Sequence, residues 1–212
     1  MPSFNKILVA NRGEIACRIQ RTAQALGYRT VAVFSDADAD ALHVRMADEA
    51  VNIGPAPAQQ SYLSIAAIID AARRTGADAI HPGYGFLSEN PKFALACREA
   101  GLTFIGPSPE AIELMGSKRL SKIAMLAAGV PCIDGYQGAE QDDASLGREA
   151  ARLGYPLMIK ASAGGGGRGM RLVQDASDLL AQIHTARSEA LNGFGSDELI
   201  LKQALIDTRH VE

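Results

Sequence analysis

The chain has 212 residues and a formal net charge of -3; 47% of its residues are hydrophobic and 21% are charged. This length allows one large domain or two small ones with a real core, and the composition excludes an intrinsically disordered protein. The slightly negative charge predicts no general affinity for nucleic acid or for an anionic membrane surface, so any phosphate binding must be local.

The N-terminal segment and the cysteines predict a cytoplasmic protein. The first residues contain one lysine and a short apolar run that breaks at Asn11, which is too short for a signal peptide, and no run approaches the ~20 residues of a membrane span. Cys17, Cys97 and Cys132 are odd in number and far apart, a pattern that favours reduced thiols over a disulfide framework or a zinc site.

Short β-rich apolar runs alternate with longer amphipathic segments in the first half of the chain. This alternation is typical of βαβ units and predicts an α/β domain with an open, doubly wound parallel sheet. The expected strands are residues 6–10, 30–34, 50–53, 79–81 and 103–105, and the expected helices are residues 14–26, 64–74 and 91–100.

A smaller unit is predicted in the second half. Residues 107–128 read as a pair of helices, the second of which ends at Gly129 before Pro131, because glycine suits a helix C-cap and proline cannot continue a helix. The elements expected beyond them are helices at residues 145–153 and 176–191 and strands at residues 157–160, 170–173 and 198–202. Residues 205–212 read as the beginning of a strand without neighbours, so we expect a truncated chain.

The strongest functional signal is the run of four glycines from Gly164 to Gly167. Ordering four glycines is costly in backbone entropy, but their amides can approach an anion with no side chain in the way. Lys160 precedes the run and adds a fixed positive charge. The run is neither a Walker A loop nor a Rossmann fingerprint. A glycine loop between two antiparallel strands is instead typical of the flap that ATP-grasp enzymes fold over a triphosphate.

Four longer motifs extend this signal: ILVANRGEIA at residues 7–16, HPGYGFLSEN at 81–90, FIGP at 104–107 and MGSK at 115–118. Together with the glycine loop and the final RHVE, they resemble biotin carboxylase in sequence and in order over essentially the whole chain. The resemblance implies a Rossmann-like N-terminal domain at residues 1–117, a helical linker at 118–131, a small α+β ATP-grasp lid subdomain at 132–203, and the start of a truncated C-terminal ATP-grasp subdomain at 204–212.

The resemblance also implies an ATP site. Lys118 and Lys160 match the two lysines that contact the nucleotide phosphates, and Lys160 also lies near the adenine. The other matched positions are the loop glycines whose amides hold the phosphates, the hinge whose backbone pairs with the adenine edge, and a histidine that approaches the sugar and phosphates: Gly166 and Gly167, then Lys202, Gln203, Ala204 and Leu205, and finally His210.

The hinge departs from the family pattern. Family members usually carry Glu-Lys-Tyr-Leu or Glu-Gln-x-Leu there, whereas this chain begins the hinge with Lys202. Backbone contacts with adenine survive this change. A side-chain acceptor is lost, however, and a second cation is placed near Lys160.

The implied reaction is the ATP-dependent carboxylation of biotin by bicarbonate, through carboxyphosphate, with Mg2+ or Mn2+ assisting phosphoryl transfer. The implied partners are a biotin carboxyl carrier, which presents the biotin, the carboxyltransferase subunit of an acyl-CoA carboxylase, and a second copy of the full-length protein. In the family, the metal-binding glutamates, the base and the catalytic arginine lie beyond the position matched by residue 212. We therefore expect no catalytic or metal-binding residue in this chain, and no activity from it alone.

Polar residues at strand ends are interpreted as structural: Asn11, Arg12, Glu14 and His81. The acidic segment Asp36, Asp38 and Asp40 is interpreted as a solvated turn, because it lacks the glycine and distal glutamate of a calcium loop. Two other readings of the whole chain stay open. One is a non-catalytic nucleotide-binding or subunit-association module. The other is a different ATP-grasp ligase, such as a carbamoyl-phosphate or purine-pathway enzyme, which is not expected to combine HPGYGFLSEN with NRGEIA.

Overall fold

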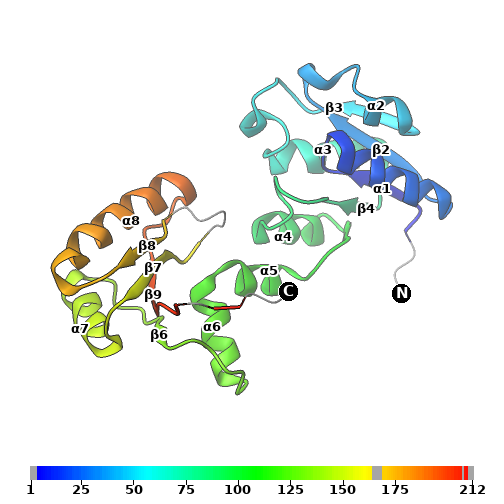
Figure 1. Cartoon of the computed structure of the whole chain (residues 1–212). Coiled ribbons are helices and arrows are strands. Elements are labelled where there is room, and N and C mark those ends of the chain that lie inside the picture. The colour runs from blue at the N-terminus through cyan, green and yellow to red at the C-terminus, as the bar shows by residue number, and fades with distance from the viewer. Residues whose placement is uncertain (1–3, 164–168, 207, 210–212) are drawn as a thin grey trace. The chain divides into compact units, whose positions relative to one another are not determined.

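The computed structural model describes residues 4–163, 169–206, 208 and 209 (Figure 1). The chain divides into two compact units, Met1–Glu113 and Leu114–Glu212. Their boundary falls within helix α5, Pro109–Gly116. The finer division at residues 117, 131 and 203 stays a prediction.

The first unit is built on a parallel sheet with the strand order β3-β2-β1-β4-β5. Its strands are β1 Lys6–Val9, β2 Arg29–Phe34, β3 Glu49–Asn52, β4 Ala79–His81 and β5 Thr103–Phe104. Ile7 of the central β1 lies opposite Thr30 of β2 on one side and Ala79 of β4 on the other. The strand order changes direction between β1 and β4, so the loops that follow these two strands meet where open α/β sheets bind ligands.

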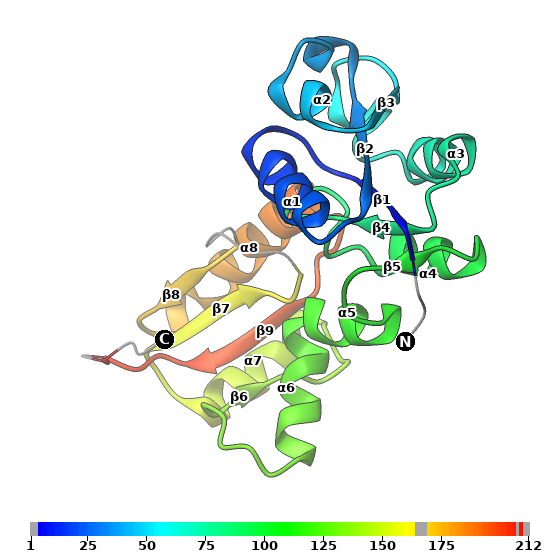
Figure 2. The same ribbon diagram turned by 90° about the vertical axis from the view of Figure 1, so that its right-hand side faces the viewer.

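Helices cover both faces of this sheet (Figure 2). They are α1 Gly13–Ala25, α2 Leu42–Met46, α3 Ile65–Thr75 and α4 Pro91–Glu99, with 3-10 turns η1 Asp36–Asp38 and η2 Ala58–Gln60. α1 packs on one face through Ala16 and Ala23. α3 and α4 pack on the opposite face through Ile68 and Phe93. This arrangement confirms the doubly wound sheet.

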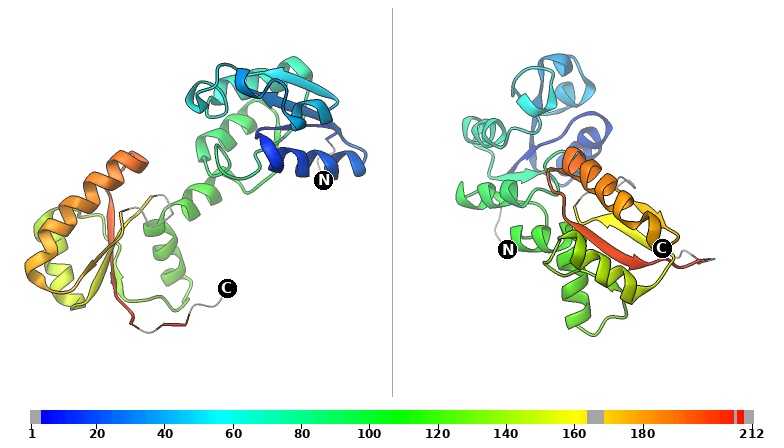
Figure 3. Two further views of the ribbon diagram at one scale, coloured as in Figure 1. Left: turned by 45° about the horizontal axis from the view of Figure 1, so that its top comes forward. Right: turned by 90° about the vertical axis from the view of Figure 1, so that its left-hand side faces the viewer.

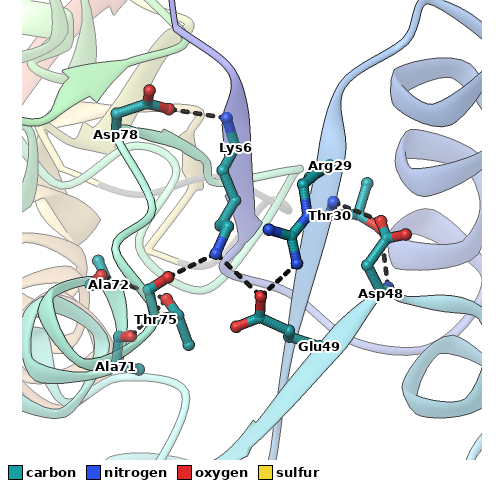
Figure 4. A network of polar contacts seen from close by, with 9 residues as sticks. All are labelled: Lys6, Arg29, Thr30, Asp48, Glu49, Ala71, Ala72, Thr75 and Asp78. Carbon is teal, nitrogen blue, oxygen red and sulfur yellow. Dashed lines mark hydrogen bonds and ion pairs between the residues drawn. The ribbon is translucent and has the colours of Figure 1, made fainter.

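A polar network ties together the amino-terminal edge of the sheet (Figure 4). Lys6 Nζ donates to Glu49 Oε1 at 2.9 Å and to the carbonyl oxygen of Thr75 at 2.6 Å. Arg29 donates to the same oxygen of Glu49 at 2.6 Å, and Asp78 accepts from the backbone N–H of Lys6 at 2.8 Å. The network therefore links the first residues of β1, β2 and β3 to the end of α3.

The second unit is built on an antiparallel sheet in the order β6-β9-β7-β8. Its elements are α6 Lys118–Ala127, β6 Gly135–Tyr136, α7 Asp143–Leu153, β7 Leu157–Ala161, β8 Arg171–Val173, η3 Ala176–Asp178, α8 Leu179–Phe194 and β9 Leu199–Gln203. α7 and α8 bury Leu146 and Ile183 against one face of the sheet. α6 lies on the other side (Figure 3).

The order of the elements up to β9 confirms the sequence prediction, apart from shifts of up to three residues at their ends. The strand expected to begin within residues 205–212 is not formed by residues 205, 206, 208 and 209, and the other four residues lie outside the described ones. Among the described elements, several short ones escape prediction because they cannot show a period: α2 has 5 residues, β6 has 2, and the turns η1 and η2 have 3 each. The prediction that the glycine loop joins antiparallel strands is also confirmed, since β7 and β8 pair in that way.

A buried amide joins the loops that follow β1 and β4. Asn11 is 2% exposed, and its Nδ2 donates to the carbonyl oxygens of Pro82 and Tyr84, each at 2.8 Å. Gly83 lies between them with φ +67, and a Cβ atom added there would lie 2.6 Å from Asn11 Nδ2. Gly85 has the same φ but nothing within 4 Å of its Cβ position. Only position 83 therefore needs glycine for space as well as for conformation.

Replacing Gly83 by alanine tests this contact, with Gly85→Ala as the matched control. Both variants place an L residue in the left-handed region, which costs about 1 kcal/mol. Gly83→Ala also displaces the Asn11 amide from its two carbonyl partners, so we expect it to lower the free energy of unfolding by about 2–4 kcal/mol. Urea unfolding followed by circular dichroism measures both losses, and equal losses would contradict the account.

Candidate functional site

All four lysines of the second unit gather on one side of its sheet. The chain has six lysines, and this unit contains Lys118, Lys122, Lys160 and Lys202. In an antiparallel sheet successive side chains point to opposite faces. Ile159 of β7 and Leu201 of β9 are fully buried in the core beneath α7 and α8. Lys160 and Lys202, which follow them, therefore point to the opposite face, where α6 lies.

Helix α6 brings Lys118 and Lys122 to one side, because residues four apart are neighbours on a helix. Ser117 caps the helix by accepting a hydrogen bond from the N–H of Leu120 at 3.2 Å. The N–H of Lys118 donates to the carbonyl oxygen of Ser162 at 3.0 Å. This bond fixes the first turn of α6 beside the end of β7, the strand that leads into the glycine loop.

The lysines of this face act on one another. Burial lowers the pKa of Lys118, and the charges of Lys160 and Lys202 lower it further. Burial also lowers the pKa of Lys202, with a contribution from Lys160. No ion pair among the described residues involves Lys160 or Lys202. A bound polyanion relieves the repulsion between these ammonium groups. The lysine face therefore suits a nucleoside triphosphate.

The base of the glycine loop is closed by its flanking residues. The N–H of Ala161 donates to the carbonyl oxygen of Gly169 at 3.1 Å, and the N–H of Gly169 donates to Glu189 Oε2 at 3.2 Å. Gly169 has φ +67, and a Cβ atom there would lie 3.0 Å from the Cβ of Ala161. Three predicted site residues lie outside the described residues: Gly166, Gly167 and His210.

Two backbone N–H groups of the hinge, residues 202–205, donate hydrogen bonds to the loops beside it. The N–H of Gln203 donates to the carbonyl oxygen of Asp134 at 3.0 Å, and that of Ala204 to the carbonyl oxygen of Pro156 at 3.1 Å. Among the hydrogen bonds that the structure describes, none uses the N–H of Leu205, whose side chain is exposed. Leu205 is therefore the hinge residue with an amide available to a ligand.

A buried carboxylate organises the carboxyl edge of the first unit. Asp38 is 6% exposed, pairs with Arg12, and accepts a hydrogen bond from the hydroxyl of Tyr62 at 2.6 Å. The interpretation of Asp38 as part of a solvated turn is wrong, although Asp36 and Asp40 are exposed. Spacing along the chain could not reveal this difference, because Arg12 and Tyr62 lie far from Asp38 in sequence.

This network fixes the charges of its members. The hydrogen bond from Arg12 is the main cause that lowers the pKa of Asp38 to about 2. Burial, followed by the hydrogen bond to Asp38, raises the pKa of Tyr62 to about 12. The ring of Phe86 stacks on Tyr62 with their centroids 5.1 Å apart, so the loop after β4 joins the same cluster.

The remaining polar residues of this edge hold loops together. The hydroxyl of Tyr84 donates to the carboxylate of Glu14. The Nδ1 of His81 accepts a hydrogen bond from the N–H of Gly83 at 3.0 Å, and burial lowers the pKa of this histidine. These contacts agree with the structural roles predicted for Glu14 and His81.

Within the described ranges, no group of three or more His, Cys, Asp or Glu side chains is placed to hold a metal ion. The helices of the same ranges include none that is long and apolar enough to cross a bilayer. Cys17, Cys97 and Cys132 form no disulfide.

The doubly wound unit, followed by an antiparallel unit with a lysine-bearing face, defines an ATP-grasp protein. The chain belongs to the biotin carboxylase family: the family model described as "Biotin carboxylase, N-terminal domain" matches residues 3–112. A second model, described as "Carbamoyl-phosphate synthase L chain, ATP binding domain", matches residues 117–212.

Similar proteins are longer than this chain. It is 58% identical over 210 residues to the methylcrotonoyl-CoA carboxylase subunit alpha, mitochondrial, of Oryza sativa subsp. japonica, an alignment that covers 99% of this chain and 28% of that protein. It is 51% identical over 209 residues to a biotin carboxylase of Halalkalibacterium halodurans, with 99% of this chain and 46% of that protein covered.

Solved structures of the family have the same fold. The biotin carboxylase domain dimer of the Hydrogenobacter thermophilus 2-oxoglutarate carboxylase, in complex with MgADP, ADP and bicarbonate, matches with a TM-score of 0.91 and 48% identity over 97% of this chain and 45% of that one. A biotin carboxylase complex with β-γ-ATP from Campylobacter jejuni also has a TM-score of 0.91, with 46% identity over 96% of this chain and 46% of that one.

The Arg12–Asp38 pair predicts a loss of stability in acid. Because the pKa of Asp38 falls from 3.8 to about 2 on folding, the unfolded chain binds this proton more readily. The stabilisation is therefore present above pH 3.8 and is lost as the pH falls toward 2. We expect Asp38→Asn to lower the free energy of unfolding by about 1–3 kcal/mol at neutral pH, and this difference to shrink in that acid range.

Urea unfolding of both proteins at a series of pH values measures this difference. Asp40→Asn, at an exposed position of the same segment, is the control and leaves stability unchanged. The free energies of unfolding of the original chain and of Asp38→Asn are compared. If their difference stays constant from neutral pH down to pH 2, the ionised carboxylate of Asp38 is not the source of the stabilisation.

Proposed function

We propose that this chain supplies part of the ATP site of a biotin carboxylase. The whole enzyme would carboxylate biotin, carried on a carrier protein, with bicarbonate and ATP, through carboxyphosphate. The lysines on one face of the antiparallel unit are the observation that supports this proposal. The charges of Lys160 and Lys202 lower the pKa of neighbouring lysines, and Lys122, Lys160 and Lys202 have no ion pair among the described residues.

Each matched residue has a proposed role. Lys118 and Lys160 donate to the nucleotide phosphates, from the first turn of α6 and the end of β7 respectively. The hinge, Lys202 to Leu205, pairs with the adenine edge, and the available N–H of Leu205 is the donor that we assign to it. The amides of Gly166 and Gly167 and the side chain of His210 complete the proposed contacts.

The relatives support the cofactors. Structures similar to this chain hold MgADP and bicarbonate, or β-γ-ATP. A divalent metal supplies charge neutralisation during phosphoryl transfer. We assign no metal ligand and no catalytic residue to this chain, and propose that it binds nucleotide without turnover. Hydrolysis of ATP by the purified chain in the presence of biotin and bicarbonate contradicts that assignment.

The proposed partners follow the names of the relatives. Several are alpha subunits or chains of methylcrotonoyl-CoA or propionyl-CoA carboxylases, and a related structure is a dimer. We therefore propose a biotin carboxyl carrier, a carboxyltransferase subunit and a second copy of the full-length protein as partners. A cytoplasmic location is proposed for a bacterial source, whereas the plant and animal relatives carry the word mitochondrial in their names.

Substitution of Lys160 tests the phosphate contact. Loss of one charge-assisted hydrogen bond to phosphate corresponds to about 10- to 100-fold in affinity, so we expect Lys160→Met and Lys118→Met each to weaken ATP binding by that factor. Isothermal titration of the purified chain with MgATP measures the change. Lys92→Met, on an exposed position of α4, is the control and leaves affinity unchanged. Unaltered binding in both site variants contradicts the proposal.

A further inference from the structure

We propose that a pocket between α6 and β9 is a binding site for a phosphate-class oxyanion, held by Lys122 and Lys202. The pocket has a volume of about 420 Å³, and its walls include Lys118, Ser121, Lys122, Cys132 and Lys202. Lys160 does not line it. The pocket therefore lies apart from the side chain of Lys160, which precedes the glycine loop. It shares Lys118 and Lys202 with the proposed nucleotide site.

Lys122 is the cation that the nucleotide roles leave unexplained. It is 8% exposed, and its Nζ donates to the carbonyl oxygen of Ile133 at 2.7 Å. An ammonium group has three donor hydrogens. Among the described residues, the Nζ of Lys122 makes no other hydrogen bond. A nearly buried ammonium with a single neutral partner is costly, because burial penalises the charged form.

Lys202 adds to this cost from the opposite wall. It lies on β9, and its charge lowers the pKa of Lys122, after burial, which is the larger cause. Cys132 and Asp134 act in the other direction, and Arg152 adds to the repulsion. Neither lysine has an ion pair in the part of the chain that the structure describes.

Two ammonium groups therefore reach the same pocket, that of Lys122 from α6 and that of Lys202 from β9. A compact oxyanion accepts hydrogen bonds from both at once and relieves their repulsion, so phosphate is the chemistry that the pocket fits. This inference does not depend on the proposed carboxylase activity.

Phosphate binding by the purified chain tests the proposal. Isothermal titration with sodium phosphate, against sodium chloride at equal ionic strength, gives the affinity. We expect Lys202→Glu, which reverses the charge, and Lys202→Gln, which removes it, to weaken phosphate binding by about tenfold or more. The Lys202 side chain has no hydrogen bond in the described structure, so both variants are expected to fold, as circular dichroism can verify. Lys122→Met is expected to weaken binding equally, and Lys92→Met to leave it unchanged.

Three results overturn the proposal: phosphate binding no stronger than chloride binding, binding that Lys202→Glu leaves intact, or an equal loss in Lys160→Met. An equal loss in Lys160→Met would place the anion beside Lys160, next to the glycine loop, and not in this pocket. Competition with ATP identifies the source of the phosphate. If ATP displaces phosphate and Lys122→Met weakens ATP binding, the pocket takes a nucleotide phosphate; if both ligands bind together, it takes inorganic phosphate. Both results support the pocket, and loss of ATP binding in Lys160→Met tests the carboxylase proposal separately.

Discussion

The alternation of side chains across the antiparallel sheet is the constraint on which the candidate site depends. Ile159 and Lys160 are adjacent on β7, yet one is fully buried beneath α7 and α8 while the other lies on the opposite face. Leu201 and Lys202 repeat this division on β9. Because the register pairs Lys202 with Met158, the two lysines lie on neighbouring strands of one face. Helix α6 adds its own cations to that face, so the unit concentrates positive charge although the chain is acidic overall.

In the first unit, burial of the sheet decides where polar side chains can lie. Its central strand β1 is buried on both faces, since Leu8 belongs to one core cluster and Val9 to another. Polar groups are therefore confined to the strand ends. At the amino edge Lys6 and Glu49 link the strands, and at the carboxyl edge a nearly buried Asp38 fixes the loop that carries the NRGEIA motif. Hydrogen bonds between residues distant in sequence hold these loops in place.

Periodicity predicted most of the fold, because strands buried on both faces and amphipathic helices leave strong patterns. It missed β6, which exists through its pairing with β9 rather than through its own residues. For the candidate site, the sequence predicted Lys118, Lys160 and Lys202, which the structure brings to one face. It gave no sign of Lys122, an ordinary helical lysine until the fold buries it. The burial of Asp38 escapes prediction for the same reason: Arg12 and Tyr62, which hold it, are distant in sequence, so only tertiary structure distinguishes it from a solvated aspartate.

The most direct test of this account is nuclear magnetic resonance of the chain with isotope-labelled lysine side chains during titration with MgATP. The six lysines give one signal each, and two of them, Lys6 and Lys92, lie in the first unit and serve as internal controls. We predict that the signals of Lys118, Lys160 and Lys202 move together as ATP binds, while those of Lys6 and Lys92 stay in place. Equal small shifts of all six, or shifts confined to the first unit, would contradict the assignment of the nucleotide site to the lysine face.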